Sequence, residues 1–256
     1  FPNQNRDYGL VGEHCSHRGA SLYYGFVEED GIRCPYHGWK YDSCGRCIEQ
    51  PFENPEIGFK DKIQHPAYPV AKLGGLLFAY LGPPERKPTV PKWDILVRQD
   101  GIKKIDVCEV LRCNWLQAME NSVDPTHTYY LHSHTLKLKG AKDYVPFHYQ
   151  PLSKIDFDLV IHPSWAGIQK QRVFTADDVP PEAPHPLIFP NILFVPVRWG
   201  YALHFRTPID DYNTQVYQFR FNPTKDGSIA EQPGDPPFEY VATKNAEGEF
   251  HLDNFA

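Results

Sequence analysis

Four residues that can bind metal ions occur in two pairs near the start of the chain, and they constrain its fold more than any other feature. Cys15 and His17 have one residue between them, and Cys34 and His37, with two residues between them, follow after a gap of sixteen. Each pair is followed by a glycine, in "CSHRG" and "CPYHG". Thiolate and imidazole groups bind metals, and glycine permits tight turns. The two loops are therefore expected to approach one compact metal centre.

The choice of metal rests on how the ligands are paired. Structural zinc also accepts two cysteines and two histidines in a tetrahedron. Zinc fingers, however, usually present cysteine with cysteine and histidine with histidine, whereas each loop here offers one of each. A [2Fe-2S] cluster in which one iron takes both thiolates and the other both imidazoles suits this arrangement. We predict such a cluster, with a structural zinc site as the alternative.

The composition is that of a globular protein with a substantial core. The chain has 256 residues, of which 41% are hydrophobic and 23% charged. Its net charge of -6 gives no basic surface for nucleic acid or for an anionic membrane. No apolar run is long enough to span a bilayer, so a cytoplasmic protein is predicted. Because the sequence opens on Phe1 and its only methionine is Met119, we expect it to be truncated at its start.

Four further cysteines need a separate explanation. An even number of cysteines also permits disulfides, but a chain of this length does not depend on them. The motif "CGRC" has the redox spacing C-x-x-C, although it lies in a polar turn and not at the start of a helix that would lower a thiol pKa. We expect ordinary thiols in a reducing compartment at Cys44, Cys47, Cys108 and Cys113.

The chain divides into two predicted domains of mainly β structure. Short strands separated by glycine, proline and aspartate continue to about Gly82, and the proline-rich stretch "GPPERKPTVPKW" follows as a linker. We place the domains at residues 1–85 and 86–256. In the second, "KIDFDLVI", "YALHFR" and "VYQFRF" alternate apolar and polar residues, which predicts half-buried antiparallel strands. With one clear helix, the fold class is α+β.

That helix leads into a second group of candidate ligands. Residues 114–124, "NWLQAMENSVD", place Trp115, Met119 and Ser122 or Val123 along one stripe. Asp124, His127 and His132 follow, with the spacing D-x2-H-x4-H. Five residues along an ideal helix separate two side chains by about 140°, so these histidines can share one ion only if Pro125 breaks the helix. Taken alone, such a pair of histidines more often serves packing or lies at the surface.

Together the two groups resemble a known family. The segment "CSHRGASL…GIRCPYHGWKYD" is similar to the Rieske motif of non-heme iron aromatic ring-hydroxylating oxygenases, most closely those of the phthalate-dioxygenase-like branch. Respiratory Rieske proteins carry two extra cysteines that form a disulfide, and Ala20 and Tyr36 stand at the corresponding positions here. The resemblance therefore implies a cluster of low reduction potential.

The resemblance also assigns roles to the second group. The catalytic (alpha) subunits carry N-x-x-D-x-x-H-x4-H, which Asn121, Asp124, His127 and His132 match in order. It implies a helix-grip (START-like) antiparallel-sheet domain in which the two histidines bind a mononuclear Fe(II). Asp124 would be the electron bridge to His37 of a neighbouring subunit in a homotrimer, with Asn121 in a supporting role. The third ligand of such a site is a carboxylate, which we expect beyond Ala256.

The function that follows from this resemblance is an oxygenase. Electrons from NAD(P)H would arrive through a separate reductase or ferredoxin, and O2 would be used to hydroxylate or oxidatively demethylate an aromatic or related organic substrate. No nucleic-acid or membrane partner is expected. The alternative from another class is a Rieske ferredoxin-like electron carrier with a non-catalytic second domain. Substrate identity and regiochemistry are not encoded in any motif of the sequence.

Overall fold

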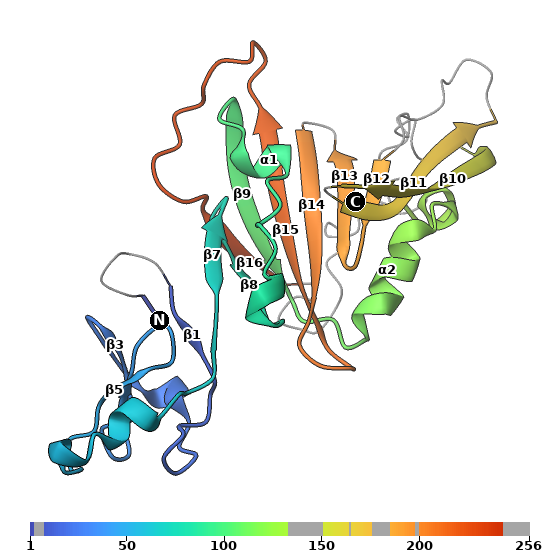
Figure 1. Ribbon diagram of the computed structural model, residues 1–256. Helices are drawn as coiled ribbons and strands as arrows, with labels where there is room; N and C mark the ends of the chain where they lie inside the picture. Colours follow the sequence, from blue (N-terminus) through green and yellow to red (C-terminus); the bar gives the residue numbers. More distant parts are fainter. Residues whose placement is uncertain (3–7, 133–150, 164, 176–184, 198–199, 243–256) are drawn as a thin grey trace. The chain divides into compact units, whose positions relative to one another are not determined.

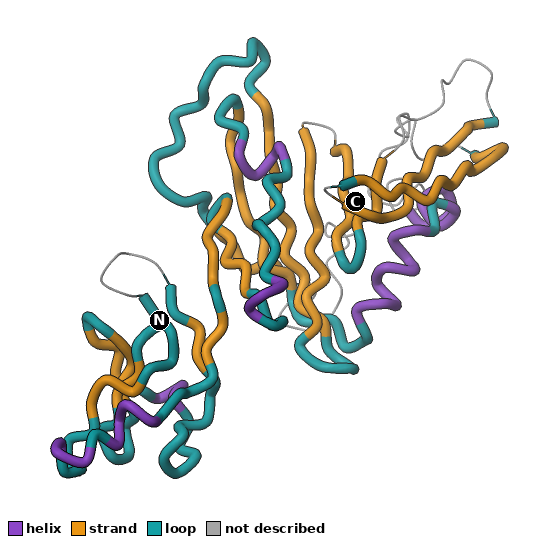
Figure 2. Tube along the Cα trace, in the orientation of Figure 1, coloured by secondary structure: helices purple, strands orange, loops and turns teal. Residues whose placement is uncertain are grey.

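The computed structural model describes residues 1–2, 8–132, 151–163, 165–175, 185–197 and 200–242. The chain forms two compact units, Phe1–Val97 and Arg98–Ala256. Strands predominate in both units (Figures 1 and 2). The division falls after Val97 and not near residue 85, since the segment after the prolines folds into a short helix whose Ile95 and Leu96 are buried.

The first unit consists of short strands joined by turns. Its central sheet has the order β2-β3-β4-β5, is antiparallel throughout, and is accompanied by two small two-stranded sheets, β1-β6 and β7-β8. The strands are β1 (Leu10–Val11), β2 (Phe26–Glu28), β3 (Gly31–Arg33), β4 (Lys40–Tyr41), β5 (Cys47–Glu49), β6 (Ala67–Tyr68), β7 (Val70–Leu73) and β8 (Leu76–Ala79). The helical turns are η1 (Leu22–Tyr24), η2 (Pro55–Ile57), η3 (Phe59–Lys62), η4 (Pro84–Arg86) and α1 (Asp94–Val97).

A network of charged side chains covers the central sheet of the first unit. Arg33 lies 2.5 Å from Glu28 and 2.7 Å from Glu49. The ammonium group of Lys40, a residue only 9% exposed, lies within 3.3 Å of both carboxylates and 3.0 Å from Asp30. Arg33 also donates to the carbonyl oxygen of Gly38 at 2.8 Å. The network thus connects the four strands of the central sheet to the turn that contains the candidate ligand His37.

The network should make the stability of this unit depend on Glu28 in acid. The hydrogen bond from Arg33 is the main cause that lowers the pKa of Glu28 from 4.5 to about 2. A depressed folded-state pKa stabilises the protein above the unfolded-state pKa and loses that contribution as the pH falls through the folded-state value. Glu28→Gln is therefore expected to lower the free energy of unfolding at pH 7, and the difference from wild type should shrink between pH 4.5 and pH 2.

Urea unfolding monitored by tryptophan fluorescence at a series of pH values measures this difference, in which contributions common to both proteins cancel. Glu29→Gln is the matched control, because Glu29 makes none of the ion pairs of the network. A constant difference between wild type and Glu28→Gln over the whole pH range would show that the ionised form of Glu28 does not stabilise the fold.

The second unit is built on one large sheet. Its eight described strands have the order β10-β11-β12-β13-β14-β15-β9-β16, antiparallel except for the parallel pair β9 and β16. They are β9 (Gly101–Cys108), β10 (Leu152–His162), β11 (Trp165–Phe174), β12 (His185–Ile188), β13 (Ile192–Val197), β14 (Gly200–Pro208), β15 (Thr214–Pro223) and β16 (Phe238–Val241). The helical elements are α2 (Trp115–Val123) and the π-helical turn η5 (Thr128–His132). Among the described residues, no helix is long and apolar enough to cross a membrane.

Helix α2 contacts β13 and β14 on one face of this sheet (Figure 1). The side chain of Asn114 caps its start by accepting the N–H of Leu116 at 3.0 Å. Met119 packs with Leu187 and Leu193 in a buried cluster, which is completed by Trp115, Val123 and Val195. The predicted apolar stripe is confirmed, and this packing fixes where the end of α2 lies on the sheet.

The predicted strands are all present, but one prediction about burial is wrong. On the predicted faces of β14 and β15, Leu203 and Phe205 are buried and Phe219 and Phe221 are fully inaccessible, while Tyr201 and Tyr217 are half-buried. In β10, by contrast, Phe157, Leu159 and Ile161 are 51%, 70% and 83% exposed. Strand β10 is at the edge of the sheet, where alternation gives it an apolar face without placing that face in the core of this chain.

Candidate metal centres

Each of the first two ligand pairs occupies a turn of the same design. The N–H of Cys15 donates to the carbonyl oxygen of Ala20 at 2.9 Å, and the N–H of Gly19 donates to the carbonyl oxygen of Cys15 at 2.9 Å. In the second turn the N–H of Cys34 donates to the carbonyl oxygen of Trp39 at 2.8 Å, and the N–H of Gly38 donates to the carbonyl oxygen of Cys34 at 3.1 Å. Gly19 and Gly38 have φ of 70° and 75°, a left-handed conformation that glycine adopts without strain.

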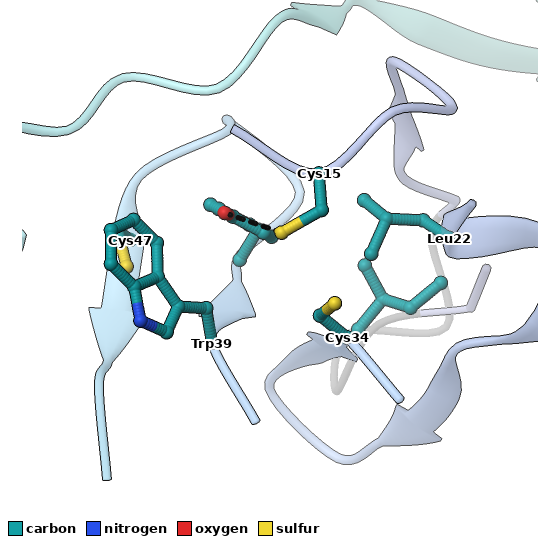
Figure 3. Close-up of a cluster of buried hydrophobic side chains, with 7 residues drawn as sticks. Cys15, Leu22, Cys34, Trp39 and Cys47 are labelled. Carbon is teal, nitrogen blue, oxygen red and sulfur yellow. Dashed lines mark hydrogen bonds between the residues drawn. The ribbon is translucent and has the colours of Figure 1, made fainter. Parts of the chain in front are cut away.

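The two thiols lie at the centre of the core of the first unit. Cys15 and Cys34 are each 3% exposed and belong to one buried cluster, whose labelled members Figure 3 shows. Burial raises the pKa of the Cys34 thiol, and its interaction with the Cys15 thiol raises it further. The backbone N–H groups of Tyr36 and His37 bond to the Cys34 sulfur and act in the opposite direction. The turn thus supplies donors that would stabilise a metal-bound thiolate.

The two imidazoles also face one another. The rings of His17 and His37 meet edge to face at 4.8 Å between centroids, and His17 stacks on Trp39 at 4.4 Å and 6°. The Nδ1 atoms of both histidines are buried and have no hydrogen-bond partner. Burial is the main cause that lowers the pKa of His17, which favours the neutral form that binds metals. Metal ligation would provide a partner for each of these two ring nitrogens.

These four residues fit a two-iron cluster better than a single ion. No group of three or more histidine, cysteine, aspartate or glutamate side chains within the described ranges converges tightly enough to hold one metal. Structural zinc would need all four donors on one ion. A [2Fe-2S] cluster needs only two protein donors on each iron, thiolates on one and imidazoles on the other. Cys15 and Cys34 share one buried cluster and the rings of His17 and His37 are in contact, a pairing of like ligands that is compatible with such a cluster.

Tyr41 adds a contact to this site that the sequence analysis did not identify. Its hydroxyl group lies 3.1 Å from Cys15 Sγ, the bond drawn as a dashed line in Figure 3, and its ring is fully buried. Burial, followed by the hydrogen bond to Cys15, raises the pKa of Tyr41 far above its usual value, so the phenol keeps its proton. A hydroxyl that donates to a cluster sulfur stabilises the reduced, more negative state and raises the reduction potential.

The second group of candidate ligands starts at the end of α2. Asp124 is the C-cap residue, and its Oδ1 accepts the N–H of Thr126 at 2.8 Å as well as the Thr126 hydroxyl group. Its Oδ2 lies 3.6 Å from His127 Nδ1. Burial works against ionisation, but the bonds from Thr126 and the proximity of His127 outweigh it and lower the pKa of Asp124. A charged carboxylate therefore lies beside the imidazole of His127.

The regular helix is interrupted at Asp124 and Pro125, as predicted, but this interruption precedes both candidate histidines. Helix α2 ends at Val123, and η5, a π-helical turn, covers Thr128–His132. A π-helix hydrogen-bonds residues five positions apart, which is the spacing of His127 and His132, and such turns occur often at functional sites. The side chain of His132 lies outside the described residues, and Asn121 is exposed on α2. The third carboxylate, expected beyond Ala256, has no counterpart among the described residues.

Two buried cations of β11 connect this segment to the sheet. Lys170 donates to the carbonyl oxygen of Ser122 in the last turn of α2, and Arg172 donates to the Thr128 hydroxyl group at 3.0 Å. A cation at the C-terminal end of a helix is favoured by the helix dipole. Both residues are 6% exposed, and alternation along β11 gave no indication of their role.

Known proteins match both units of the chain. A family model described as "Rieske [2Fe-2S] domain" matches residues 1–71. The 5,5'-dehydrodivanillate O-demethylase oxygenase subunit of Sphingobium sp. (strain NBRC 103272 / SYK-6) is 40% identical over 223 residues, which cover 82% of this chain and 48% of that protein. Phenoxybenzoate dioxygenase subunit alpha of Ectopseudomonas oleovorans is 37% identical over 210 residues, with coverage of 74% and 47%. The chain spans about half the length of these curated relatives.

The fold agrees with this relationship. The solved structure of the terminal oxygenase of carbazole 1,9a-dioxygenase from Nocardioides aromaticivorans IC177 aligns with a TM-score of 0.65 at 21% identity, covering 87% of this chain and 66% of that one. The chain therefore carries a Rieske [2Fe-2S] domain followed by a sheet-rich domain, and it is homologous to the oxygenase subunits of Rieske aromatic oxygenases. The α+β fold class is confirmed.

Proposed function

We propose that this chain is the oxygenase component of a Rieske system that hydroxylates or oxidatively demethylates an aromatic substrate with O2. The observation that carries the proposal is the presence of two metal-ligand groups on one chain, the Cys15–His37 loops and the α2–η5 segment. An electron carrier needs only the first. Relatives that match across both units are oxygenase subunits, which argues against the electron-carrier alternative.

The residues divide between electron transfer and oxygen chemistry. Cys15, Cys34, His17 and His37 hold the [2Fe-2S] cluster, which supplies one electron at a time when bound. His127 and His132, with a carboxylate beyond Ala256, hold Fe(II), which supplies the chemistry of O2 activation. Asp124 orients His127 and connects the two centres between neighbouring subunits of a homotrimer. Asn121 lies three residues before Asp124 and supports this contact.

The electron donor is a separate protein. NAD(P)H would be oxidised by a reductase, and electrons would reach the cluster directly or through a ferredoxin. A solved relative of the same fold, the oxygenase of carbazole 1,9a-dioxygenase, forms a complex with a ferredoxin. Exposed aromatic residues close to the ligand loops, among them Tyr23, Tyr24 and Tyr36, provide a surface of the kind that protein partners use.

The substrate class is suggested by the relatives. Dehydrodivanillate and phenoxybenzoate, from which two of them take their names, are both aromatic carboxylates that carry an ether oxygen on the ring. We therefore propose an aromatic acid with an alkoxy or aryloxy substituent, in which oxidation next to the ether oxygen releases a phenol.

The full-length protein, supplied with a reductase, NADH and ¹⁸O2, tests this proposal. We expect a hydroxylated or demethylated aromatic acid, with label in the new hydroxyl group or in the released aldehyde, and no product when the aromatic acid is omitted. An electron carrier would instead reduce cytochrome c under the same conditions and form no labelled product from any member of an aromatic-acid panel.

A further inference from the structure

A fully buried histidine, His65, lies next to the ligand loop of Cys15. It is 0% exposed, and both of its ring nitrogens are hydrogen-bonded. Its Nε2 lies 2.8 Å from the carbonyl oxygen of Gly12, and its Nδ1 lies 2.8 Å from the Ser16 hydroxyl oxygen. A carbonyl oxygen can only accept, so Nε2 donates to Gly12 and Nδ1 accepts from Ser16. This arrangement defines one neutral tautomer and joins both sides of the loop that contains Cys15.

The same ring also supports Tyr41. The two rings stack at 4.4 Å between centroids with an angle of 28°. Tyr41 is equally inaccessible, and its hydroxyl group is the one that lies 3.1 Å from Cys15 Sγ. His65 is thus connected to Cys15 twice, through the neighbouring residue Ser16 and through the phenol that hydrogen-bonds the sulfur.

The backbone of His65 is itself firmly placed. Its N–H bonds to the carbonyl oxygen of Gly45 at 2.8 Å. Gly45 has a φ of 80°, and a Cβ atom at that position would lie 2.1 Å from the carbonyl oxygen of His65. The polar turn at "CGRC" therefore serves to hold the segment from which the imidazole reaches the ligand loop.

We propose that His65 is a positioning residue for the iron–sulfur centre, which holds the Cys15 loop and keeps the Tyr41 hydroxyl group on the Cys15 sulfur. The inference rests on the proposed ligand role of Cys15. A hydrogen bond to a ligand sulfur favours the reduced cluster, and its strength depends on distance and angle. A residue that fixes the phenol therefore sets the reduction potential without touching the cluster.

A double-mutant cycle between His65 and Tyr41 tests the proposal, with the reduction potential of the cluster as the readout. His65→Phe retains an aromatic ring but loses both hydrogen bonds. This variant is expected to lower the reduction potential of the cluster by up to about 59 mV, which for one electron corresponds to a tenfold change in the reduction equilibrium. Tyr41→Phe should shift it in the same direction. In the Tyr41→Phe background, His65→Phe should cause little further shift. An equal shift in both backgrounds, or none in wild type, would overturn the proposal.

Two further variants make the test independent of folding. His65→Gln can still donate to Gly12, so its potential should lie between those of wild type and His65→Phe. If His65→Phe does not retain iron and sulfide, Ser16→Ala replaces it in the cycle, because it removes only the bond to Nδ1. His14, exposed and adjacent to Cys15, gives the control His14→Phe, which should leave the potential unchanged. A wild-type protein without a cluster would contradict the proposed function itself. A wild-type protein that contains the cluster, but in which the effects of the His65 and Tyr41 substitutions on the potential are independent, would contradict only the role of His65.

Discussion

Replacing Cys34 with serine will remove the visible colour of the protein. A serine hydroxyl does not ionise near neutral pH, whereas the Cys34 site has backbone N–H groups of Tyr36 and His37 bonded to the sulfur. Iron and acid-labile sulfide attributable to the cluster should fall to near zero. Because metal binding is coupled to folding, the first unit should also lose stability, visible as a lower midpoint of urea unfolding.

Cys44 provides the matched control for this prediction. It is an exposed free thiol in the same unit, ten residues further along the chain. Cys44→Ser should keep the absorption spectrum, the iron content and the sulfide content of wild type. A Cys34→Ser protein that keeps the spectrum of a Rieske cluster would show that Cys34 is not a ligand.

The second large effect is expected at Asp124, where asparagine should leave both metal centres occupied and block turnover. Asparagine retains Oδ1, so it can still accept the N–H of Thr126 and cap α2. It removes the negative charge next to His127 Nδ1, at 3.6 Å. Loss of a carboxylate partner of a metal-bound histidine typically costs roughly 10- to 100-fold in activity, and a role in electron transfer would add to that loss.

Product formation per unit time, measured together with iron content, separates these effects. Glu120→Gln is the control, since it removes an exposed carboxylate from the same helix. It should retain normal turnover. If Asp124→Asn formed product at the wild-type rate with full iron content, Asp124 would have no part in the path of the electrons.

The secondary structure around the candidate sites could be predicted where local signals were strong. The stripe of Trp115 and Met119 predicted a helix over residues 114–124, and α2 begins and ends within one residue of those bounds. Alternation identified β10, β14 and β15, but it did not show that the apolar face of β10 is exposed. Alternation reports that one face of a strand is apolar, and it does not say whether that face packs in the same chain.

The candidate sites show the same division between local and distant information. The spacing of Cys15, His17, Cys34 and His37 was enough to predict a centre at which they meet. The supporting contacts join residues far apart in the sequence, 26 positions for Tyr41 and Cys15 and 49 for His65 and Ser16. Single tyrosine and histidine residues carry no periodic pattern, so these contacts emerge only once the strands are folded. Pro125 likewise predicted a break in the helix but not the π-helical turn that follows.

The most direct test of this account is the content of iron and acid-labile sulfide per chain in the full-length protein. Three irons and two sulfides are predicted, which corresponds to one [2Fe-2S] cluster and one mononuclear iron. Two irons and two sulfides would contradict the oxygenase function and leave an electron carrier. Zinc without sulfide would contradict the iron–sulfur centre itself.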